Sequence, residues 1–150
     1  MLISSHVLAG AVIGSVARRH PVAAFAAGAA SHLMMDACPH WGVAMAGPED
    51  EELFLRVARC DGCAGLAAMA VCAAVAPPQA RRATLAGMLG AAAFDLDKPC
   101  QHFLGFNPSP VWFRRIHAAV QREAPHRLPH EVVTAAALAV LALAALGVRR

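Results

Sequence analysis

Five uncharged and strongly apolar runs dominate this chain of 150 residues and limit the folds that it can adopt. The runs are rich in alanine, leucine and valine, and none shows the alternation of apolar and polar residues that is typical of a half-buried strand. No hairpin signal lies between them either. The pattern therefore predicts an all-α protein. The runs cover residues 1–17, 21–35, 62–78, 83–94 and 132–148.

We expect these runs to form an up-and-down bundle of about five main apolar helices in a single domain, residues 1–150. One or two short helices are expected beside them, at 51–59 and 111–123. The long loops then form one polar, ligand-bearing end of the bundle. Charged residues and prolines set the expected main helices at 2–17, 22–38, 61–76, 83–96 and 131–148.

The composition argues against nucleic-acid binding and against a disulfide framework. The net charge is only +3, and no basic run with interleaved aromatic residues occurs. The five cysteines are an odd number, and three of them lie in apolar helical stretches. Cys60 and Cys63 have C-x-x-C spacing, but the chain offers no second pair for a zinc finger. Nothing in the sequence specifies an oligomeric state.

The apolar runs fit two environments. Three of them reach 17 residues, which is close to the lower limit of about 17 for a helix that spans a bilayer. One interpretation is a compact multi-pass bundle in a bacterial-type inner membrane, with short helices in a locally thinned bilayer. The alternative is a soluble cytoplasmic bundle with an alanine-packed core.

Arginines at one end of the expected bundle favour the membrane interpretation. This end carries six arginines and no acidic residue, as the cytoplasmic ends of membrane proteins do. The opposite, ligand-bearing end would then face away from the cytoplasm. The six residues are Arg18, Arg19, Arg81, Arg82, Arg149 and Arg150.

Residues 31–41 contain the strongest candidate site. His32 and Asp36 stand four residues apart, which places an imidazole and a carboxylate side by side on one helix face. Pro39 ends this helix, so His40 follows just beyond the helix end. An unpaired carboxylate in apolar surroundings would be costly, so we expect Asp36 to contact a cation or a histidine. The simpler alternative is an Asp–His pair that satisfies itself.

Threading the runs up and down brings further ligand-type side chains to the same end. All ten acidic residues and seven of the eight histidines fall there. Such a set suits a divalent ion, with zinc the first choice and manganese the second. The candidates exceed the needs of one four-coordinate ion, which leaves the number of ions open between one and three. The preferred ligands are His6, His32, Asp36, Asp95 and His117, followed by Asp61 and Asp97.

Hydrolysis is the chemistry that a divalent metal at this end would support, because a metal-bound water becomes a nucleophile near neutral pH. His40 and Gln121 are the candidate catalytic residues, and Gln121 lies one helical turn from His117. Arg114 and Arg115 are candidates for holding a substrate phosphate. The alternative for these two arginines is that they are solvated charges on an amphipathic helix.

With these residues in view, the chain resembles the YdjM-like family of membrane-bound metal-dependent hydrolases, which are small inner-membrane proteins. That family is distantly similar to zinc-dependent phospholipase C and the P1-type nucleases, all-α enzymes that cleave phosphodiesters with zinc held by histidine and aspartate. The family often has a proline where this chain has Phe94. The matching pieces are Ser5-His6, Ser31-His32-Leu33-Met34-Met35-Asp36 with Pro39-His40-Trp41, and Phe94-Asp95-Leu96-Asp97.

The resemblance implies a membrane-associated, metal-dependent hydrolase of a phosphoester or phosphodiester, including that of a lipid. Its cofactor would be one to three zinc ions, and its partners would be the substrate and the bilayer. The alternative, from another class, is a non-catalytic membrane scaffold that is stapled by metal or binds a partner. A transporter is disfavoured because residues 7–17 and 132–148 carry no ionisable group at mid-membrane depth.

Overall fold

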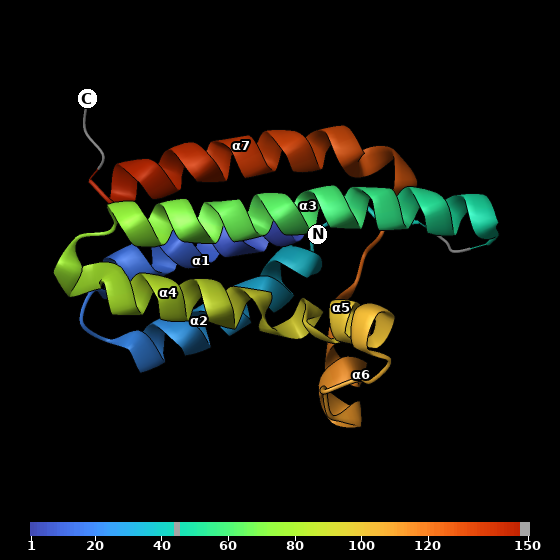
Figure 1. Ribbon diagram of the computed structural model, residues 1–150, viewed down its shortest axis with the longest axis horizontal. Coiled ribbons are helices and arrows are strands. Elements are labelled where there is room, and N and C mark those ends of the chain that lie inside the picture. Colours follow the sequence, from blue (N-terminus) through green and yellow to red (C-terminus); the bar gives the residue numbers. More distant parts are fainter. Residues whose placement is uncertain (44–45, 148–150) are drawn as a thin grey trace.

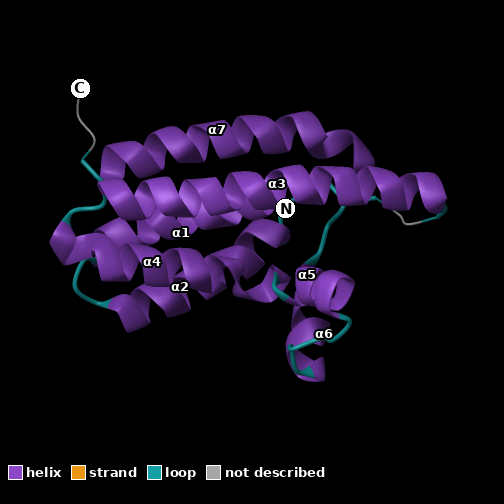
Figure 2. Ribbon diagram, in the orientation of Figure 1, coloured by secondary structure: helices purple, strands orange, loops and turns teal. Residues whose placement is uncertain are grey.

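The computed structural model describes residues 1–43 and 46–147, and these residues form helices and loops without a strand (Figure 1 and Figure 2). This arrangement confirms the all-α prediction, including the five main helices. These are α1 (Ile3–Ala17), α2 (Pro21–Asp36), α3 (Pro48–Val75), α4 (Pro78–Ala92) and α7 (Leu128–Ala145). The shorter pieces are a 3₁₀ turn at Ala93–Asp95, α5 (Asp97–Pro99), a π-helical turn at Cys100–Leu104, α6 (Val111–Val120) and a 3₁₀ turn at Pro125–Arg127.

Prolines and glycines fix several of the helix ends. Pro21, Pro48 and Pro78 each occupy the first turn of a helix, where a missing backbone N–H breaks no intrahelical hydrogen bond. At the other end of the chain, α7 stops just before Gly147, whose φ of 80° lies in the left-handed region that favours glycine.

The prediction of separate helices at 51–59 and 61–76 is wrong, because α3 runs without a break from Pro48 to Val75. Asp61 and Gly62 lie inside this helix. A single glycine costs a helix only about 1 kcal/mol, which a helix of 28 residues tolerates. The charged residues near this point therefore do not mark a helix end.

The predicted helix at 111–123 is too long, because α6 ends at Val120. The residues that follow pair with the segment after α2 instead of continuing the helix. The His40 N–H donates to the Arg122 carbonyl at 3.0 Å, and the Ala124 N–H donates to the His40 carbonyl at 2.7 Å. This pairing, which forms one isolated bridge, ties the two ligand-bearing segments together.

The helix α1 lies at the centre of the bundle. It packs against α2, α3, α4 and α7, and nine of its residues are buried. Figure 1 shows α7 and α3 side by side along one side of the bundle, with α4 and α2 along the other. Gly10 of α1 and Gly28 of α2 both meet Gly87 of α4 so closely that a Cβ atom at any of them would overlap backbone. Small residues therefore let three helix backbones touch.

The buried core consists mostly of small side chains. The largest fully buried side chain among the described residues is that of Met88, and the next three are histidines: His6, His32 and His40. Imidazole rings therefore fill the interior at one end of the bundle. The apolar cluster in the middle comprises Val7, Leu8, Ala11, Cys72, Ala76, Met88, Ala92, Ala142 and Leu146.

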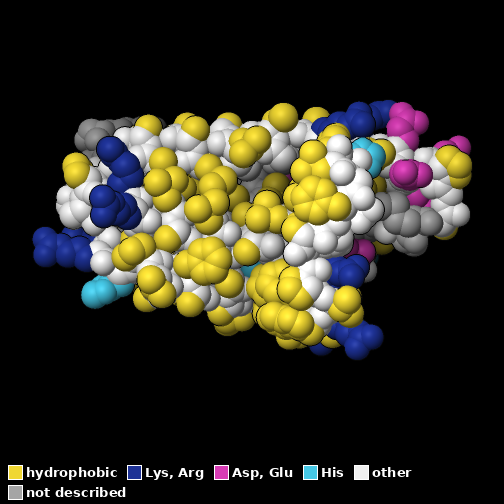
Figure 3. Space-filling model, turned by 60° about the horizontal axis from the view of Figure 1, so that its bottom comes forward, with side chains coloured by type: hydrophobic (Ala, Val, Ile, Leu, Met, Phe, Trp, Pro, Cys, Tyr) yellow, Lys and Arg dark blue, Asp and Glu magenta, His cyan; other side chains and the backbone are white. Residues whose placement is uncertain are grey.

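The two ends of the bundle differ as predicted. Arg18 and Arg19 follow α1, and the loop that contains them lies beside Gln79 at the start of α4, where Arg81 and Arg82 are also exposed. On the face drawn in Figure 3, Lys and Arg side chains lie at this end without Asp or Glu, both kinds occur at the opposite end, and apolar side chains cover the middle. Arg149 and Arg150 lie outside the described residues.

Two helices are long and apolar enough to cross a membrane: α3 and the segment Pro125–Ala145 that contains α7. In the most apolar 18-residue window of each, only 11% of the residues are buried inside the bundle. These helices therefore expose most of their apolar side chains instead of packing them into a protein core.

Candidate metal centre

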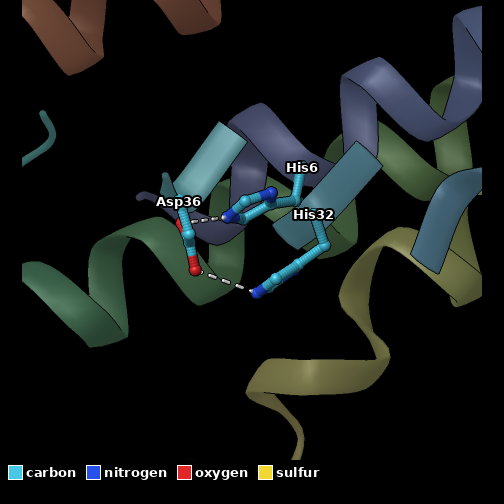
Figure 4. Close-up of side chains that lie close together, drawn as sticks. All are labelled: His6, His32 and Asp36. Carbon is cyan, nitrogen blue, oxygen red and sulfur yellow. Dashed lines mark hydrogen bonds and ion pairs between the residues drawn. The ribbon is translucent and has the colours of Figure 1, made fainter. Parts of the chain in front are cut away.

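The carboxylate of Asp36 lies among three imidazoles that come from three different helices. Its Oδ1 is 3.1 Å from Nε2 of His6. Its Oδ2 is 3.1 Å from Nε2 of His32 and 3.0 Å from Nε2 of His117. All four residues are buried. Figure 4 shows the His6 and His32 rings pointing toward Asp36 from α1 and α2. Four of the predicted ligands therefore converge on one point.

Local sequence explains how each helix delivers its ligand. His32 and Asp36 are four residues apart on α2, so both project from the face that meets α1 and α4. Ser5 and His6 occupy the first turns of α1, at the same end of the bundle. His117 lies near the end of α6, the short helix that contacts α2.

Aromatic packing holds the imidazoles in place. The rings of His6 and His32 stack with centroids 3.8 Å apart. Phe94 lies 5.3 Å from the His32 ring and 5.6 Å from the His117 ring, and it stacks on Phe113 at 3.9 Å. Phe94 therefore supports two of the ligands.

The hydrogen bonds of His32 determine which of its nitrogens faces the site as a ligand. Its Nδ1 is 2.6 Å from the carbonyl oxygen of Ala91, so this nitrogen must carry a proton and donate it. In the neutral ring, Nε2 then has a lone pair, which faces Asp36 Oδ2 and, at 3.1 Å, Nε2 of His117. Lone pairs of a carboxylate and an imidazole repel one another. A proton or a metal cation between them relieves this repulsion.

The donor set fits a divalent metal by distance and by chemistry. In a tetrahedral zinc site with bonds of about 2.0–2.1 Å, the donor atoms lie about 3.3 Å apart. Here four donor pairs lie 3.0–3.1 Å apart, a few tenths of an ångström closer. The Ala91 carbonyl also supplies the second hydrogen bond that orients a metal-bound imidazole. Nδ1 of His6 is buried and has no such partner among the described residues.

Two groups of ligand-type atoms lie close enough to hold a metal ion: His6, His32 and Asp36 form the first, and His32, Asp95 and His117 form the second. The Asp95 carboxylate is 4.0 Å from Nε2 of His32 and 3.8 Å from Nε2 of His117. Its Oδ1 is also 2.9 Å from the ammonium of Lys98. This contact is an ion pair without directed hydrogen-bond geometry, because Oδ1 has no donor in hydrogen-bonding position among the described residues. The site thus has two halves joined by His32.

Burial and charge act in opposite directions on Asp95 and Lys98. Burial alone would raise the pKa of the Asp95 carboxyl, but the Lys98 ammonium and the nearby His32 and His6 hold it below its usual range. Burial alone would lower the pKa of Lys98, but the Asp95 carboxylate raises it above its usual range. At neutral pH this edge of the site therefore holds a charged pair.

Gln121 and His40 continue the site away from Asp36. The side-chain nitrogen of Gln121 donates to Asp36 Oδ2 at 2.7 Å and lies 2.6 Å from Nε2 of His117. Its side-chain oxygen is 2.7 Å from Nε2 of His40, whose Nδ1 donates to the Cys38 carbonyl at 2.9 Å. The two predicted catalytic residues are therefore in contact, with Gln121 adjacent to the ligands and His40 behind it.

Asp61 lies elsewhere in the structure. Its carboxylate accepts hydrogen bonds from the backbone N–H groups of Ile3 and Ser4 at 2.6 and 3.2 Å and from the Ser4 hydroxyl. Glu131 accepts a further bond from the N–H of Leu2 at 2.8 Å. These carboxylates satisfy the free donors at the start of α1, where the helix dipole favours negative charge. Asp61 thus positions α1, and it belongs to neither ligand group.

Asp97 and the two arginines lie outside the ligand groups. Asp97 is half-buried, and its Oδ1 has no hydrogen-bond partner among the described residues. Arg114 and Arg115 are exposed on α6, and within the described part of the chain neither side chain makes an ion pair or hydrogen bond. The structure thus places both arginines on the helix that carries His117 without bringing them to Asp36.

Two groups at the site are missing from the sequence prediction: Lys98 and the amine of Met1, which lies 2.8 Å from Asp36 Oδ1. The contact of Glu131 with the start of α1 is missing from it as well. Lys98 could have been found, because it follows Asp95 by three residues, the spacing of a helical ion pair. Glu131 and Met1 carry no local signal, since their partners are far away in sequence.

Comparison of the chain with protein-family models, with curated proteins and with solved structures gives no match. We therefore infer the function from the geometry of the site.

Proposed function

We propose that this protein is a membrane-associated, metal-dependent hydrolase of phosphoesters or phosphodiesters, with its metal held by His6, His32, Asp36 and His117. The observation that carries the proposal is the convergence of three imidazole Nε2 atoms on one buried carboxylate. Burial of a carboxylate and three imidazoles is costly unless cations or hydrogen bonds compensate for it. A divalent cation would neutralise the carboxylate and accept all of the imidazole lone pairs together.

Zinc is the first choice for the cofactor and manganese the second. Imidazole and carboxylate donors without thiolate suit both ions, and donor pairs 3.0–3.1 Å apart come close to the spacing in a zinc site. When bound, such an ion would lower the pKa of a coordinated water enough to supply hydroxide near neutral pH. The two ligand groups, joined by His32, accommodate one or two ions with these residues.

The remaining polar residues suit hydrolysis. Gln121 contacts both Asp36 and His117 and is fixed from behind by His40, so this pair orients the ligands. The edge of the site that Asp95 and Lys98 form is its more open side, because these side chains are 12% and 48% exposed. A substrate would approach over this edge, where the cationic Lys98 favours a phosphate. Arg114, one turn before His117 on α6, would add a second cation.

The apolar exterior supports a membrane location. In a soluble protein, an apolar helix serves as a core helix and is mostly buried, whereas α3 and α7 leave most of their apolar residues uncovered. Large exposed apolar surfaces of this kind need a non-aqueous partner. We propose a multi-pass protein of a bacterial-type inner membrane, with the arginine end in the cytoplasm and the metal end on the other side. The soluble alternative would require a partner protein over the same surface.

A metal-stapled scaffold is the second candidate, and the burial of the ligands favours it. His6, His32 and Asp36 are fully buried, and structural metal sites are closed in this way, whereas catalytic sites keep one open position. The two candidates share the same metal, so they differ only in whether substrate reaches it.

Elemental analysis of the detergent-purified protein, combined with a hydrolysis assay, tests the proposal. Wild type should contain stoichiometric zinc or manganese and cleave a chromogenic phosphodiester or a phospholipid in vesicles. The Asp36→Ala variant should lose both the metal and the activity. The control Arg82→Ala removes an exposed charge at the opposite end and should retain both. Metal-free wild type with undiminished hydrolysis would contradict the proposal, and stoichiometric metal without hydrolysis would favour the scaffold.

A further inference from the structure

Lys98 is the only lysine in the chain, since the other twelve basic side chains are arginines. Among the described residues, it is also the one lysine or arginine side chain that pairs with a candidate metal ligand, whereas Asp36 pairs with the amine of Met1. Its ammonium lies 2.9 Å from Asp95 Oδ1, in the half of the site that His32 and His117 complete. The position of this lysine therefore bears directly on whether that half can take a cation.

A lysine releases a carboxylate partner more readily than an arginine does. An arginine would hold a carboxylate through a rigid bidentate fork, whereas an ammonium is a compact point charge on a flexible four-carbon stem. The Lys98 side chain is 48% exposed, so it can swing into solvent without unpacking the site. Asp95, by contrast, is held at the end of α4 beside buried His32 and cannot follow it.

The charges at this edge are balanced only while Lys98 is in place. Asp95 has no other permanent cation near it in the described structure, and the neighbouring Asp97 has a buried oxygen without a partner. A divalent ion bound by His32, Asp95 and His117 would neutralise these carboxylates equally well. It would also repel an ammonium that stays 2.9 Å from one of its ligand atoms.

We propose that Lys98 is a built-in competitor for the second metal position, and that its ammonium holds Asp95 until a second divalent ion displaces it. This inference rests on the proposed metal centre at Asp36 and adds a determinant of metal stoichiometry. The first ion binds at the buried Asp36 half. The second binds more weakly, because Lys98 must leave Asp95 before that ion enters. Once displaced, the ammonium lies on the open side of the site.

Zinc titration tests this proposal on the full-length protein in detergent, with stripped protein reloaded at fixed ionic strength and bound metal counted after equilibrium dialysis. Four proteins are compared: wild type, Lys98→Met, Lys98→Arg and Arg56→Met. Lys98→Met removes the competing charge at nearly constant length. Lys98→Arg keeps the positive charge on a side chain that binds the Asp95 carboxylate more firmly. Arg56→Met removes one charge from an exposed pair with Glu52 on α3, away from the site.

Wild type should bind one ion tightly and a second ion weakly. Lys98→Met should bind the second ion about tenfold or more tightly than wild type, the scale on which residues around a ligand shell change metal affinity. Lys98→Arg should bind the second ion no better than wild type, and Arg56→Met should match wild type. Circular dichroism of each variant establishes that the fold is intact.

Equal affinity of the second ion for wild type and Lys98→Met would overturn the inference while leaving the first site untouched. Two ions bound with equal strength by wild type would overturn it as well, since Lys98 would then offer no competition. An equal gain in Arg56→Met would show a general charge effect and would also count against it. Wild type that binds no ion at all would instead refute the proposed function, and the inference with it.

Discussion

The same helices form both ends of the bundle, but ionisable side chains are exposed at one end and buried at the other. At the arginine end, Arg18, Arg19, Arg81 and Arg82 remain exposed. At the metal end, three buried histidines each have Nε2 within 3.1 Å of the buried Asp36 carboxylate. Burial of a charge is tolerated only where partners compensate for it. Among the described residues, the buried histidines and carboxylates all lie at the metal end, whereas the arginine end buries only the hydroxyl side chains of Ser15 and Thr84.

Among the predictions that test this difference between the ends, substitution of the shared ligand should have the largest effect on the amount of bound metal. His32 belongs to both ligand groups, so His32→Ala should abolish all metal binding. His6→Ala and Asp95→Ala each affect one group, so each should lose part of the bound metal and keep the remainder. Elemental analysis of the three variants measures the difference. Arg82→Ala at the opposite end is the matched control and should retain all of the metal.

Equal metal loss in His32→Ala and Asp95→Ala would indicate one shared site instead of two halves. Metal loss in Arg82→Ala would show that the two ends are coupled through the fold, and would contradict the view that only the metal end binds the ion.

The membrane proposal predicts that the two ends lie on opposite sides of the bilayer. Cys38 is exposed at the metal end, and Gln79 is exposed at the arginine end. We expect a membrane-impermeant maleimide to label a variant with Cys38 as its single cysteine on intact spheroplasts. A cysteine-free background carrying Gln79→Cys should be labelled only in inverted vesicles. Labelling of both positions from the same side would contradict the proposed orientation.

The smallest predicted effect concerns the pH dependence of the metal-free protein. Folding depresses the pKa of Asp95 below its ordinary 3.8, so the stability that this group adds is present above that pH and lost as the pH falls below it. Folding raises the pKa of Lys98 above 10.5, so the stability that Lys98 adds is present below that pH and lost as the pH rises further. Both groups lie outside the proposed membrane-spanning helices.

Lys98→Met should therefore be less stable than wild type between these limits, by about 1 kcal/mol or less, because Lys98 is half exposed and solvent screens the pair. Thermal unfolding in detergent with a chelator, across this pH range, measures the difference. The gap should close on both the acid and the alkaline side. A constant gap at every pH would show that packing of the lysine stem, and not its charge, is responsible.

Much of the site was predictable because helices impose a spacing. His32 and Asp36 meet through the i, i+4 rule, and their placement required only that the run around them be helical. To place His6, Asp95 and His117 at the same end, one further assumption was needed: that consecutive runs alternate in direction. The helices α1, α2 and α4 pack closely at their glycines, and this close packing brings the side chains into contact.

Other roles could not be assigned from the sequence. Asp61 has the residue type and the approximate position of a ligand, yet the start of α1 takes its carboxylate for backbone hydrogen bonds. The sequence also did not predict that α3 continues through Asp61, because charged residues followed by a glycine are typical of a helix end. In both cases a contact between residues far apart in sequence outweighed the local pattern.

Periodicity and composition act locally, so the amino-acid sequence alone predicts the helical class, the polarity of the two ends and the residue types available for a metal. Which of these candidates meet depends on the tertiary structure. It brings the imidazoles of His6, His32 and His117 to the carboxylate of Asp36, assigns Asp61 to the start of α1, and pairs Asp95 with Lys98. Coordination depends on atoms approaching within a few ångströms, and that approach is fixed by helix packing across the whole chain.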